Sequence, residues 1–323
     1  MSHYLVTGAA GFIGARTSQM LIEQGHTVVG IDNMNDAYDP RMKDYRLKKL
    51  QAMEGFTFHK HDISEKSAID LFKNEKIDGV INLAARAGVR YSVENPWVFL
   101  ESNVTGTLNM LEVCRQFGCK KFILASTSSI YGENPEYPTP ETASSSEPMQ
   151  PYAASKKGAE ALAHSYHHLY DIDVTIVRYF TVYGPAGRPD LAIFRFVKWI
   201  IEGEPIRING DGKQSRGFTY VDDIARGTIA ALKPLGYEVI NLGGHEVISI
   251  NGLVELVEDL TGKKANVQYG PPNLADMFMN QANVTKAREM LGWDPQVNLR
   301  EGIGNLIKWY YAERDWAKDV LMP

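Results

Sequence analysis

The chain has 323 residues, of which 44% are hydrophobic and 23% charged, as in an ordinary globular protein with one large or two closely associated domains. Its 34 Lys and Arg against 39 Asp and Glu give a formal net charge of -5, which argues against a nucleic-acid partner. Cys114 and Cys119 are too few for a disulfide framework and fit a reducing cytoplasm. The sequence shows neither an apolar run of about 20 residues nor a signal peptide, so we expect a cytoplasmic protein without membrane contact.

Short apolar runs alternate with amphipathic stretches through the first half of the chain. We predict buried strands at residues 4–6, 28–31, 80–83, 121–125 and 174–177. We predict helices near residues 103–117 and 152–170. Strands and helices in regular alternation predict an α/β fold of the Rossmann type, in which a doubly wound parallel sheet carries helices on both faces. Ligands of such sheets bind beyond the carboxyl ends of the strands.

The alternation weakens after about residue 180, where proline and glycine become more frequent. We therefore predict a doubly wound domain over residues 1–180 and a smaller C-terminal α/β lobe, for the substrate, over most of residues 181–323. The run at 239–242 has the composition of one more sheet strand, so we expect the chain to return to the first domain near residues 218–245. The polar, proline-containing segment 134–149 is predicted to be a loop.

A glycine-rich turn directly follows the first predicted strand. Gly8, Gly11 and Gly14 have the spacing that lets the backbone turn tightly, approach a pyrophosphate and pack a helix closely on a strand. Asp32 ends the second predicted strand, where a carboxylate accepts hydrogen bonds from ribose hydroxyls and repels a 2′-phosphate. A glycine triplet alone also fits a plain strand-to-helix turn, and an aspartate alone also fits a helix cap. Together they predict a site for NAD rather than NADP.

Tyr152 and Lys156 are four residues apart and therefore share one face of a predicted helix. An ammonium so placed lowers the pKa of a phenol, which is about 10 when unperturbed. A phenolate beside a nicotinamide ring can take a hydroxyl proton as hydride leaves the same carbon. We therefore predict that the protein is an enzyme.

A hydroxyl-rich run, Ser126 to Ser129, follows the strand predicted at 121–125. Hydroxyls at this place can donate to a sugar oxygen, although the run also fits a turn whose hydroxyls bond to the backbone. For Thr127 we expect contact with the sugar, because Tyr152 is its predicted partner.

These motifs together resemble the extended short-chain dehydrogenase/reductase superfamily, and the resemblance extends from the first strand to Leu291-Gly292-Trp293-x-Pro295. It rests on the glycine turn, the hydroxyl-rich run, the Tyr-x-x-x-Lys pair and three further motifs: Leu83-Ala84-Ala85, Ser102-Asn103-Val104-x-Gly106-Thr107 and Arg178-Tyr179-Phe180-x-x-Tyr183-Gly184-Pro185. Within the superfamily the chain is similar to the NAD-dependent nucleotide-sugar epimerases.

Finer marks favour one group of these epimerases. The segments 87–96 and 181–190 are similar to those of UDP-glucuronate 4-epimerases. UDP-glucose 4-epimerases usually carry asparagine where this chain has Thr181. UDP-glucuronate decarboxylases carry glutamate where it has Ser129, and 4,6-dehydratases carry Asp-Glu where it has Ser128 and Ser129. Because each of those two reactions needs an additional acid or base at this place, the serines argue against both.

The resemblance implies a mechanism and a set of site residues. Tyr152 takes the proton from O4 of the sugar while the C4 hydride passes to NAD, Thr127 holds the same oxygen, and Lys156 anchors the nicotinamide ribose. Besides Tyr152 and Lys156, the residues expected around NAD are Gly8, Gly11, Phe12, Ile13, Gly14, Asp32, Asn33, Asp62, Ile63, Leu83, Ala84, Ala85, Asn103 and Tyr179. Those expected around the nucleotide sugar are Ser128, Ser129, Thr181, Arg188, Arg216 and Asp276.

A uronic acid substrate brings a hazard, because its 4-keto intermediate is a β-keto acid that loses CO2 unless the carboxylate is held. Arg188 is our candidate for holding it, since a guanidinium pairs with a carboxylate through two bonds. A surface ion pair or a contact with the diphosphate are the other roles open to Arg188. Arg216 lies where the family binds the diphosphate but is followed by Gly217 in place of the usual aspartate, and Asp276 matches its motif loosely.

The expected activity is NAD-dependent 4-epimerisation of UDP-glucuronate to UDP-galacturonate. The alternatives are a 4-epimerase of UDP-glucose or UDP-N-acetylglucosamine, a UDP-glucuronate decarboxylase and a non-catalytic NAD-binding regulator. His164 and His168 have the spacing of a metal-binding pair, but no third ligand accompanies them, so we expect no metal. By resemblance to relatives, the helices near residues 103–117 and 152–170 form the contact of a homodimer.

Overall fold

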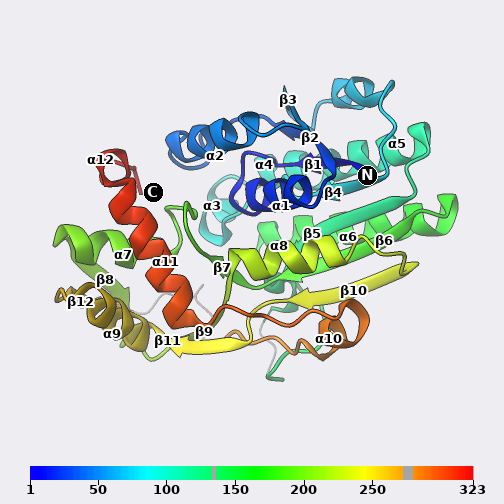
Figure 1. Ribbon diagram of the computed structural model, residues 1–323. Helices are drawn as coiled ribbons and strands as arrows, with labels where there is room; N and C mark the ends of the chain where they lie inside the picture. Colours follow the sequence, from blue (N-terminus) through cyan, green and yellow to red (C-terminus); the bar gives the residue numbers. More distant parts are fainter. Residues whose placement is uncertain (133–135, 272–278, 323) are drawn as a thin grey trace.

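A computed structural model describes residues 1–132, 136–271 and 279–322, which form a large sheet with helices on both faces and a smaller lobe beside it (Figure 1). The seven strands of the large sheet are all parallel, in the order β10-β6-β5-β4-β1-β2-β3. Their bounds are β1 His3–Thr7, β2 Thr27–Asp32, β3 Phe56–Lys60, β4 Gly79–Asn82, β5 Lys121–Thr127, β6 Asp173–Tyr179 and β10 Tyr237–Leu242. The predicted Rossmann-type fold is confirmed, and β3 is the strand of this sheet that the sequence did not indicate.

The strands of this sheet are apolar throughout because both of its faces are covered. Val6 and Ile81 belong to the core on one face, whereas their chain neighbours Leu5 and Val80 belong to the core on the other. One face is covered by α1 Phe12–Glu23, α2 Arg41–Gln51 and α8 Val221–Ala230. The other is covered by η1 Lys66–Phe72, η2 Leu100–Thr105, α5 Gly106–Phe117 and α6 Pro151–Tyr170.

The two helices predicted from the sequence are confirmed as α5 and α6. α6 begins with Pro151, whose missing N–H is not needed in the first turn, and ends at Asp171 in the left-handed conformation. α5 continues directly from the π-helical turn η2 and ends at Gly118, which has a φ of 77°. Short elements flank these helices: α3 Val89–Glu94, α4 Trp97–Phe99 and η3 Ser128–Tyr131.

The smaller lobe lies beside the large sheet and has its own apolar core, which includes Phe194, Leu253 and Ile303. It contains a three-stranded sheet, β11-β9-β7, and a parallel pair, β12-β8. The bounds are β7 Thr181–Tyr183, β8 Pro205–Asn209, β9 Ser215–Tyr220, β11 Glu246–Ser249, β12 Asn266–Gly270, α7 Ala192–Glu202, α9 Ile250–Thr261, α11 Leu299–Ala312 and α12 Arg314–Ala317.

The chain leaves the large sheet after β6 and returns to it for α8 and β10. β10 pairs in parallel with β6, so the strand predicted at 239–242 is confirmed at the edge of the large sheet. α10, Thr285–Leu291, packs on β10 and α8. The chain therefore crosses between the large sheet and the smaller lobe more than once. The division of the chain into two domains at residue 180 stays a prediction.

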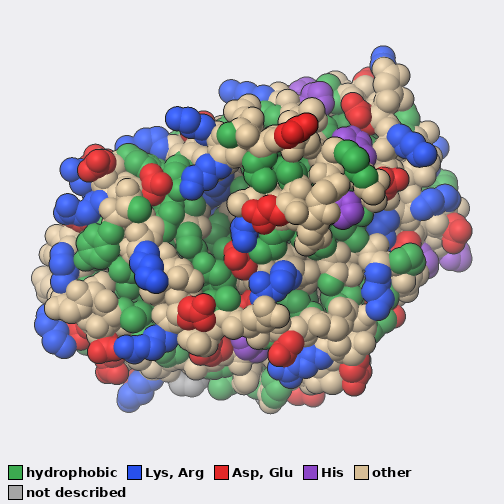
Figure 2. Space-filling view, viewed as in Figure 1, with side chains coloured by type: hydrophobic (Ala, Val, Ile, Leu, Met, Phe, Trp, Pro, Cys, Tyr) green, Lys and Arg blue, Asp and Glu red, His purple; other side chains and the backbone are tan. Residues whose placement is uncertain are grey.

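The surface carries both signs of charge. Figure 2 shows Lys and Arg side chains interspersed with Asp and Glu over one face. Within the described residues, we find no helix with the length and apolar character needed to cross a bilayer.

Two helical glycines differ in the space around them. A Cβ atom added at Gly227, in α8, would lie 2.9 Å from Cδ1 and Nε1 of Trp293 and 3.0 Å from Cδ1 of Leu242. The Trp293 indole cannot easily yield, because its Nε1 donates to the carbonyl oxygen of Asp223 at 2.7 Å. At Gly304, in α11, an added Cβ would meet no described atom within 4 Å.

We predict opposite effects on stability when these two glycines are replaced by alanine. Gly304→Ala raises the free energy of unfolding by about 0.5–1 kcal/mol, because alanine favours a helix more than glycine does. Gly227→Ala lowers it by about 1–2 kcal/mol, because overpacking against Trp293 outweighs that gain. Urea unfolding followed by circular dichroism measures both changes, and a stabilised Gly227→Ala variant would contradict this packing of Trp293.

Candidate active site

The carboxyl ends of the central strands open into a cleft of about 1350 Å³. The large sheet supplies one side of the cleft and the smaller lobe supplies the other, through residues of α7, β8 and β9. The lining includes every predicted cofactor and substrate residue within the described chain, apart from Asn103. Asp276 lies outside the described residues. The fold therefore gathers residues from Gly8 to Arg216 around one space.

Asn103 is fully buried behind the wall of the cleft. Its side-chain oxygen accepts from the backbone N–H of Arg86 at 2.8 Å, and its amide nitrogen donates to the Arg86 carbonyl at 3.0 Å. The same nitrogen donates to Oγ of Ser155 at 2.9 Å. Asn103 thus holds the backbone at Arg86 against α6, and a direct contact with the cofactor stays a prediction.

The glycine turn between β1 and α1 leaves no room for side chains. A Cβ atom added at Gly14 would lie 2.1 Å from the carbonyl oxygen of Gly8, and one added at Gly11 would lie 2.8 Å from it. Gly8 itself has a φ of 66°, a conformation that glycine adopts readily. α1 begins immediately afterwards, at Phe12, so its first N–H groups lie at the turn. This arrangement fits a dinucleotide pyrophosphate.

Asp32, at the end of β2, is buried and paired with Lys43 of α2. Its Oδ1 accepts from Nζ of Lys43 at 3.0 Å and from the backbone N–H of Met34 at 2.9 Å. Because both contacts use Oδ1, a ribose hydroxyl can still donate to Oδ2. Lys43 was missed in the sequence, since a lysine 11 residues beyond a strand carries no signal of pairing with it.

Tyr152 and Lys156 line the cleft from α6, as their spacing predicts. Burial raises the pKa of Tyr152, while a hydrogen bond with Thr127 and the charge of Arg188 act to lower it. The expectation that Lys156 lowers the pKa of this phenol is therefore wrong for the protein alone. The physical reason is that burial disfavours the phenolate, and Arg188 is the cation whose charge acts on it.

Lys156 is 3% exposed and has its own electrostatic partner on α6. Burial lowers the pKa of Lys156 to about 8, and the carboxylate of Glu160, one turn further on, opposes that shift. Glu160 is in turn bound by Arg178 of β6 through two hydrogen bonds, at 3.0 and 2.8 Å. Lys156 is consequently mostly an ammonium below about pH 8. The pair of Glu160 and Arg178 also joins α6 to β6 beside it.

The hydroxyl-rich run covers the end of β5 and the start of η3. Thr127 Oγ1 accepts from the backbone N–H of Ser129 at 3.2 Å and also donates to Oγ of Ser129 at 3.2 Å. Ser128 Oγ accepts from Nδ2 of Asn280 at 3.2 Å. Thr127 therefore stabilises the turn and also interacts with Tyr152, and its contact with the sugar stays a prediction.

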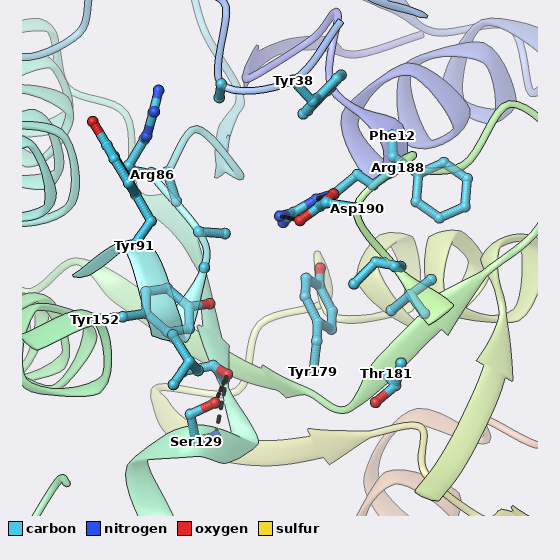
Figure 3. Close-up of a pocket in the computed structure, with 18 of the residues that line it drawn as sticks. Phe12, Tyr38, Arg86, Tyr91, Ser129, Tyr152, Tyr179, Thr181, Arg188 and Asp190 are labelled. Atoms are coloured by element: carbon cyan, nitrogen blue, oxygen red, sulfur yellow. Dashed lines mark hydrogen bonds and ion pairs between the residues drawn. The ribbon is translucent and has the colours of Figure 1, made fainter. Parts of the chain in front are cut away.

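Arg188 and Asp190 lie across the cleft from Tyr152 (Figure 3). Nε of Arg188 donates to Oδ1 of Asp190 at 3.0 Å, and Nη2 donates to Oδ2 at 2.5 Å. Although burial opposes both charges, their attraction raises the pKa of Arg188 and lowers that of Asp190. A guanidinium has five N–H groups, so donors remain for a ligand after Asp190 is bound.

Three further predicted residues border the cleft from β6, β7 and β9. The hydroxyl of Tyr179 shares a hydrogen bond with Thr228 at 2.7 Å, and burial raises its pKa. Thr181 is the first residue of β7 and pairs in register with Phe218 of β9. Arg216 of β9 donates to the carbonyl oxygen of Ser215 at 2.8 Å.

Several basic side chains line the cleft. Arg86, Arg90, Arg195 and Arg207 line it together with Arg188 and Arg216, which suits a ligand with several negative charges. These residues come from segments far apart in the chain, so no local motif marks them as a group. The described part of the chain holds no cluster of three or more His, Cys, Asp or Glu suited to a metal ion.

Residues 4–243 match the NAD dependent epimerase/dehydratase family. The chain is 54% identical over 323 residues to a UDP-glucuronate 4-epimerase of Thermodesulfobacterium geofontis, and the match covers 99% of each chain. Its structure is similar to that of UDP-glucuronic acid 4-epimerase from Bacillus cereus in complex with UDP-glucuronic acid and NAD, with a TM-score of 0.90, 36% identity and coverage of 96% of this chain and 99% of the other. It is also similar to a UDP-glucose 4-epimerase of Thermotoga maritima with UDP-glucose, with a TM-score of 0.89, 32% identity and coverage of 97% and 99%.

Proposed function

The chain belongs to the NAD dependent epimerase/dehydratase family, and we propose that it is an NAD-dependent 4-epimerase that converts UDP-glucuronate into UDP-galacturonate. The observation that carries the proposal is the position of Arg188 across one cleft from the Tyr152 phenol (Figure 3). A phenol can exchange a proton with a sugar hydroxyl, and a guanidinium can hold a sugar carboxylate. The 54% identity to a UDP-glucuronate 4-epimerase supports the same substrate.

In the proposed reaction, Tyr152 as phenolate accepts the proton of the sugar O4, and Thr127 donates a hydrogen bond to the same oxygen. NAD, held by the glycine turn, Asp32 and Lys156, would supply hydride transfer at C4 in both directions. Burial raises the pKa of the Tyr152 phenol, and within this chain the hydrogen bond with Thr127 and the charge of Arg188 favour its phenolate. The Lys156 ammonium, one turn further along α6, prevails below about pH 8 and is our candidate donor to the nicotinamide ribose.

Inversion requires the 4-keto sugar to present its other face before hydride returns, while Tyr152 gives its proton back to O4. During that time the sugar carboxylate lies β to a ketone and is prone to leave as CO2. We assign the carboxylate to Arg188, with hydroxyls of Ser128, Ser129 and Thr181 as further donors in the same cleft. Since 128 and 129 are serines, no side-chain acid stands there to promote elimination or decarboxylation.

Tyr152→Phe is expected to lower kcat for UDP-glucuronate epimerisation by about 100- to 10,000-fold, the range of general acid–base catalysis. Binding of NAD and UDP-glucuronate should persist, because the phenol ring stays in the wall. Tyr166→Phe is the matched control, since Tyr166 lies on the same helix and donates to Glu112 at 2.5 Å, outside the cleft. Product separation by chromatography with NMR measures turnover, and full activity in Tyr152→Phe would refute the mechanism.

Arg188→Ala is expected to lower kcat/KM for UDP-glucuronate by about 10- to 100-fold, the contribution of hydrogen bonds to a charged group. The fraction of substrate converted to CO2 and a UDP-pentose should rise in the same variant. UDP-glucose, which has no carboxylate, should be affected much less. Arg300→Ala is the control, because Arg300 pairs with Asp259 on the exposed surface. An unchanged kcat/KM in Arg188→Ala would remove Arg188 from the carboxylate site.

We also propose a homodimer in which η2, α5 and α6 meet the same helices of a second copy. Exposed apolar side chains lie near both ends of α6: Val93, Trp97 and Leu100 near its start, and Leu169 and Tyr170 at its end. Burial of such side chains favours association. Light scattering of the purified protein should give twice the mass of one chain, and Trp97→Asp should reduce it; a wild-type mass of one chain would contradict the proposal.

The two cysteines support the cytoplasmic location that we propose. Cys114 and Cys119 are both buried free thiols, which a reducing compartment keeps unpaired. Fractionation of cells that express the protein, with recovery of the protein among soluble cytoplasmic markers, is the measurement that checks this location.

A further inference from the structure

Arg46 of α2 is 5% exposed and is held by oxygen atoms of uncharged groups. Its Nη1 donates to the carbonyl oxygen of Ala10 at 3.2 Å and to the hydroxyl of Tyr38 at 2.8 Å. Its Nε and Nη2 donate to the carbonyl oxygen of Ala186 at 2.9 and 2.7 Å, and Nη2 also reaches the carbonyl oxygen of Gly187 at 3.2 Å. A fork of five N–H groups is needed to make these bonds, which a lysine ammonium lacks.

The partners of Arg46 come from three separate parts of the chain. Ala10 lies in the glycine turn, Tyr38 lies in the loop after β2, and Ala186 and Gly187 directly precede Arg188. The guanidinium also lies over the rings of Phe12 and Tyr38, at 5.8 and 5.5 Å from their centroids. One buried side chain therefore joins the cofactor turn to the segment that carries Arg188.

Arg46 stands behind the wall of the cleft. Phe12, Tyr38 and Arg188 line the cleft and occupy the same side of it in Figure 3. Arg46 is not among the described residues that line the cleft. Because Arg46 contacts Phe12 and Tyr38, which form part of this wall, any effect of Arg46 on a ligand must pass through the wall residues.

The segment held by Arg46 has an unfavourable backbone. Ala186 has a φ of 52°, in the left-handed region that residues with a Cβ seldom adopt. The following N–H, of Gly187, closes a tight turn onto the carbonyl oxygen of Gly184 at 3.1 Å, and a Cβ at Gly187 would lie 2.9 Å from that oxygen. Such a conformation persists only where the surroundings hold it, and Arg46 binds the Ala186 carbonyl with two donors.

We propose that Arg46 is a positioning residue that locks the Arg188 segment against the glycine turn, and so sets the selection of a uronic acid over a neutral sugar. The inference rests on the proposed function in one respect, namely the contact of Arg188 with the substrate carboxylate. It adds that this contact depends on a residue that touches neither substrate nor cofactor. Loss of the Arg46 fork should release Ala186 from its strained conformation and displace Arg188, two residues further on.

The test compares two ligands that differ at the carboxylate, UDP-glucuronate and UDP-glucose. Their Kd values are measured by calorimetry on NAD-loaded protein in a Tyr152→Phe background, so that neither ligand is turned over. Arg46→Lys is expected to weaken UDP-glucuronate by about tenfold and UDP-glucose by less than about twofold, because one charge-assisted contact is displaced. Arg41→Lys is the control, since Arg41 lies on the same helix but is 44% exposed and pairs with Asp39.

A merely structural role for Arg46 would weaken both ligands equally or lower the melting temperature alone, and either result would overturn the inference. Arg46→Gln and Tyr38→Phe extend the test, since the first shortens the fork and the second removes one of its acceptors. Both should shift the ratio of the two Kd values in the same direction as Arg46→Lys. Turnover of UDP-glucuronate by the wild-type chain is measured separately. Failure to form UDP-galacturonate would refute the proposed function. The effect of Arg46 is decided independently, by the two Kd values.

Discussion

The buried ion pair between Glu160 and Arg178 is the interaction on which the placement of the reacting groups depends. It joins α6, which carries Tyr152 and Lys156, to β6, the strand next to the edge strand β10 of the large sheet. Arg178 also donates to the hydroxyl of Tyr131 at 3.0 Å, and that hydroxyl donates to Asn241 of β10 at 2.7 Å. Two buried charges are stabilising only when both are fully hydrogen-bonded, and this network meets that condition. This network thereby fixes the position of α6 relative to the large sheet.

The cleft combines a fixed apolar scaffold with an excess of guanidinium groups. On one side the strand ends and α6 present hydroxyls and a phenol, with Arg86 and Arg90 beside them, and on the other side the smaller lobe presents Arg195, Arg207 and Arg216. A nucleotide sugar acid carries charge on its diphosphate and on its carboxylate, so several cations are needed along its length. Asp190 orients one of these guanidinium groups, because it pairs with Arg188 and leaves some of its N–H donors for a ligand. Selectivity therefore depends on how the lobes are placed relative to one another.

Patterns of short range predicted the fold and the cofactor turn correctly. Apolar runs predicted β1, β2, β4, β5, β6 and β10, because strands covered on both faces are apolar throughout. The apolar pattern did not predict β3, because it is an edge strand whose residues are half exposed and include both apolar and polar types. The pKa of Tyr152 was misjudged for a different reason. Spacing along a helix shows which side chains share a face, but it does not show how deeply the protein buries them.

The sequence by itself determined the glycine turn, the Tyr-x-x-x-Lys face and the hydroxyl-rich strand end, since each is a local pattern whose geometry follows from backbone rules. Only the tertiary structure decided that Lys43 pairs with Asp32, that Asn103 stands behind the cleft and that Arg46 joins three segments. It also decided that arginines from α3, α7, β8 and β9 converge on one space. The physical reason is that such contacts join residues distant in the chain, and their distances follow from how the sheet and the smaller lobe pack together.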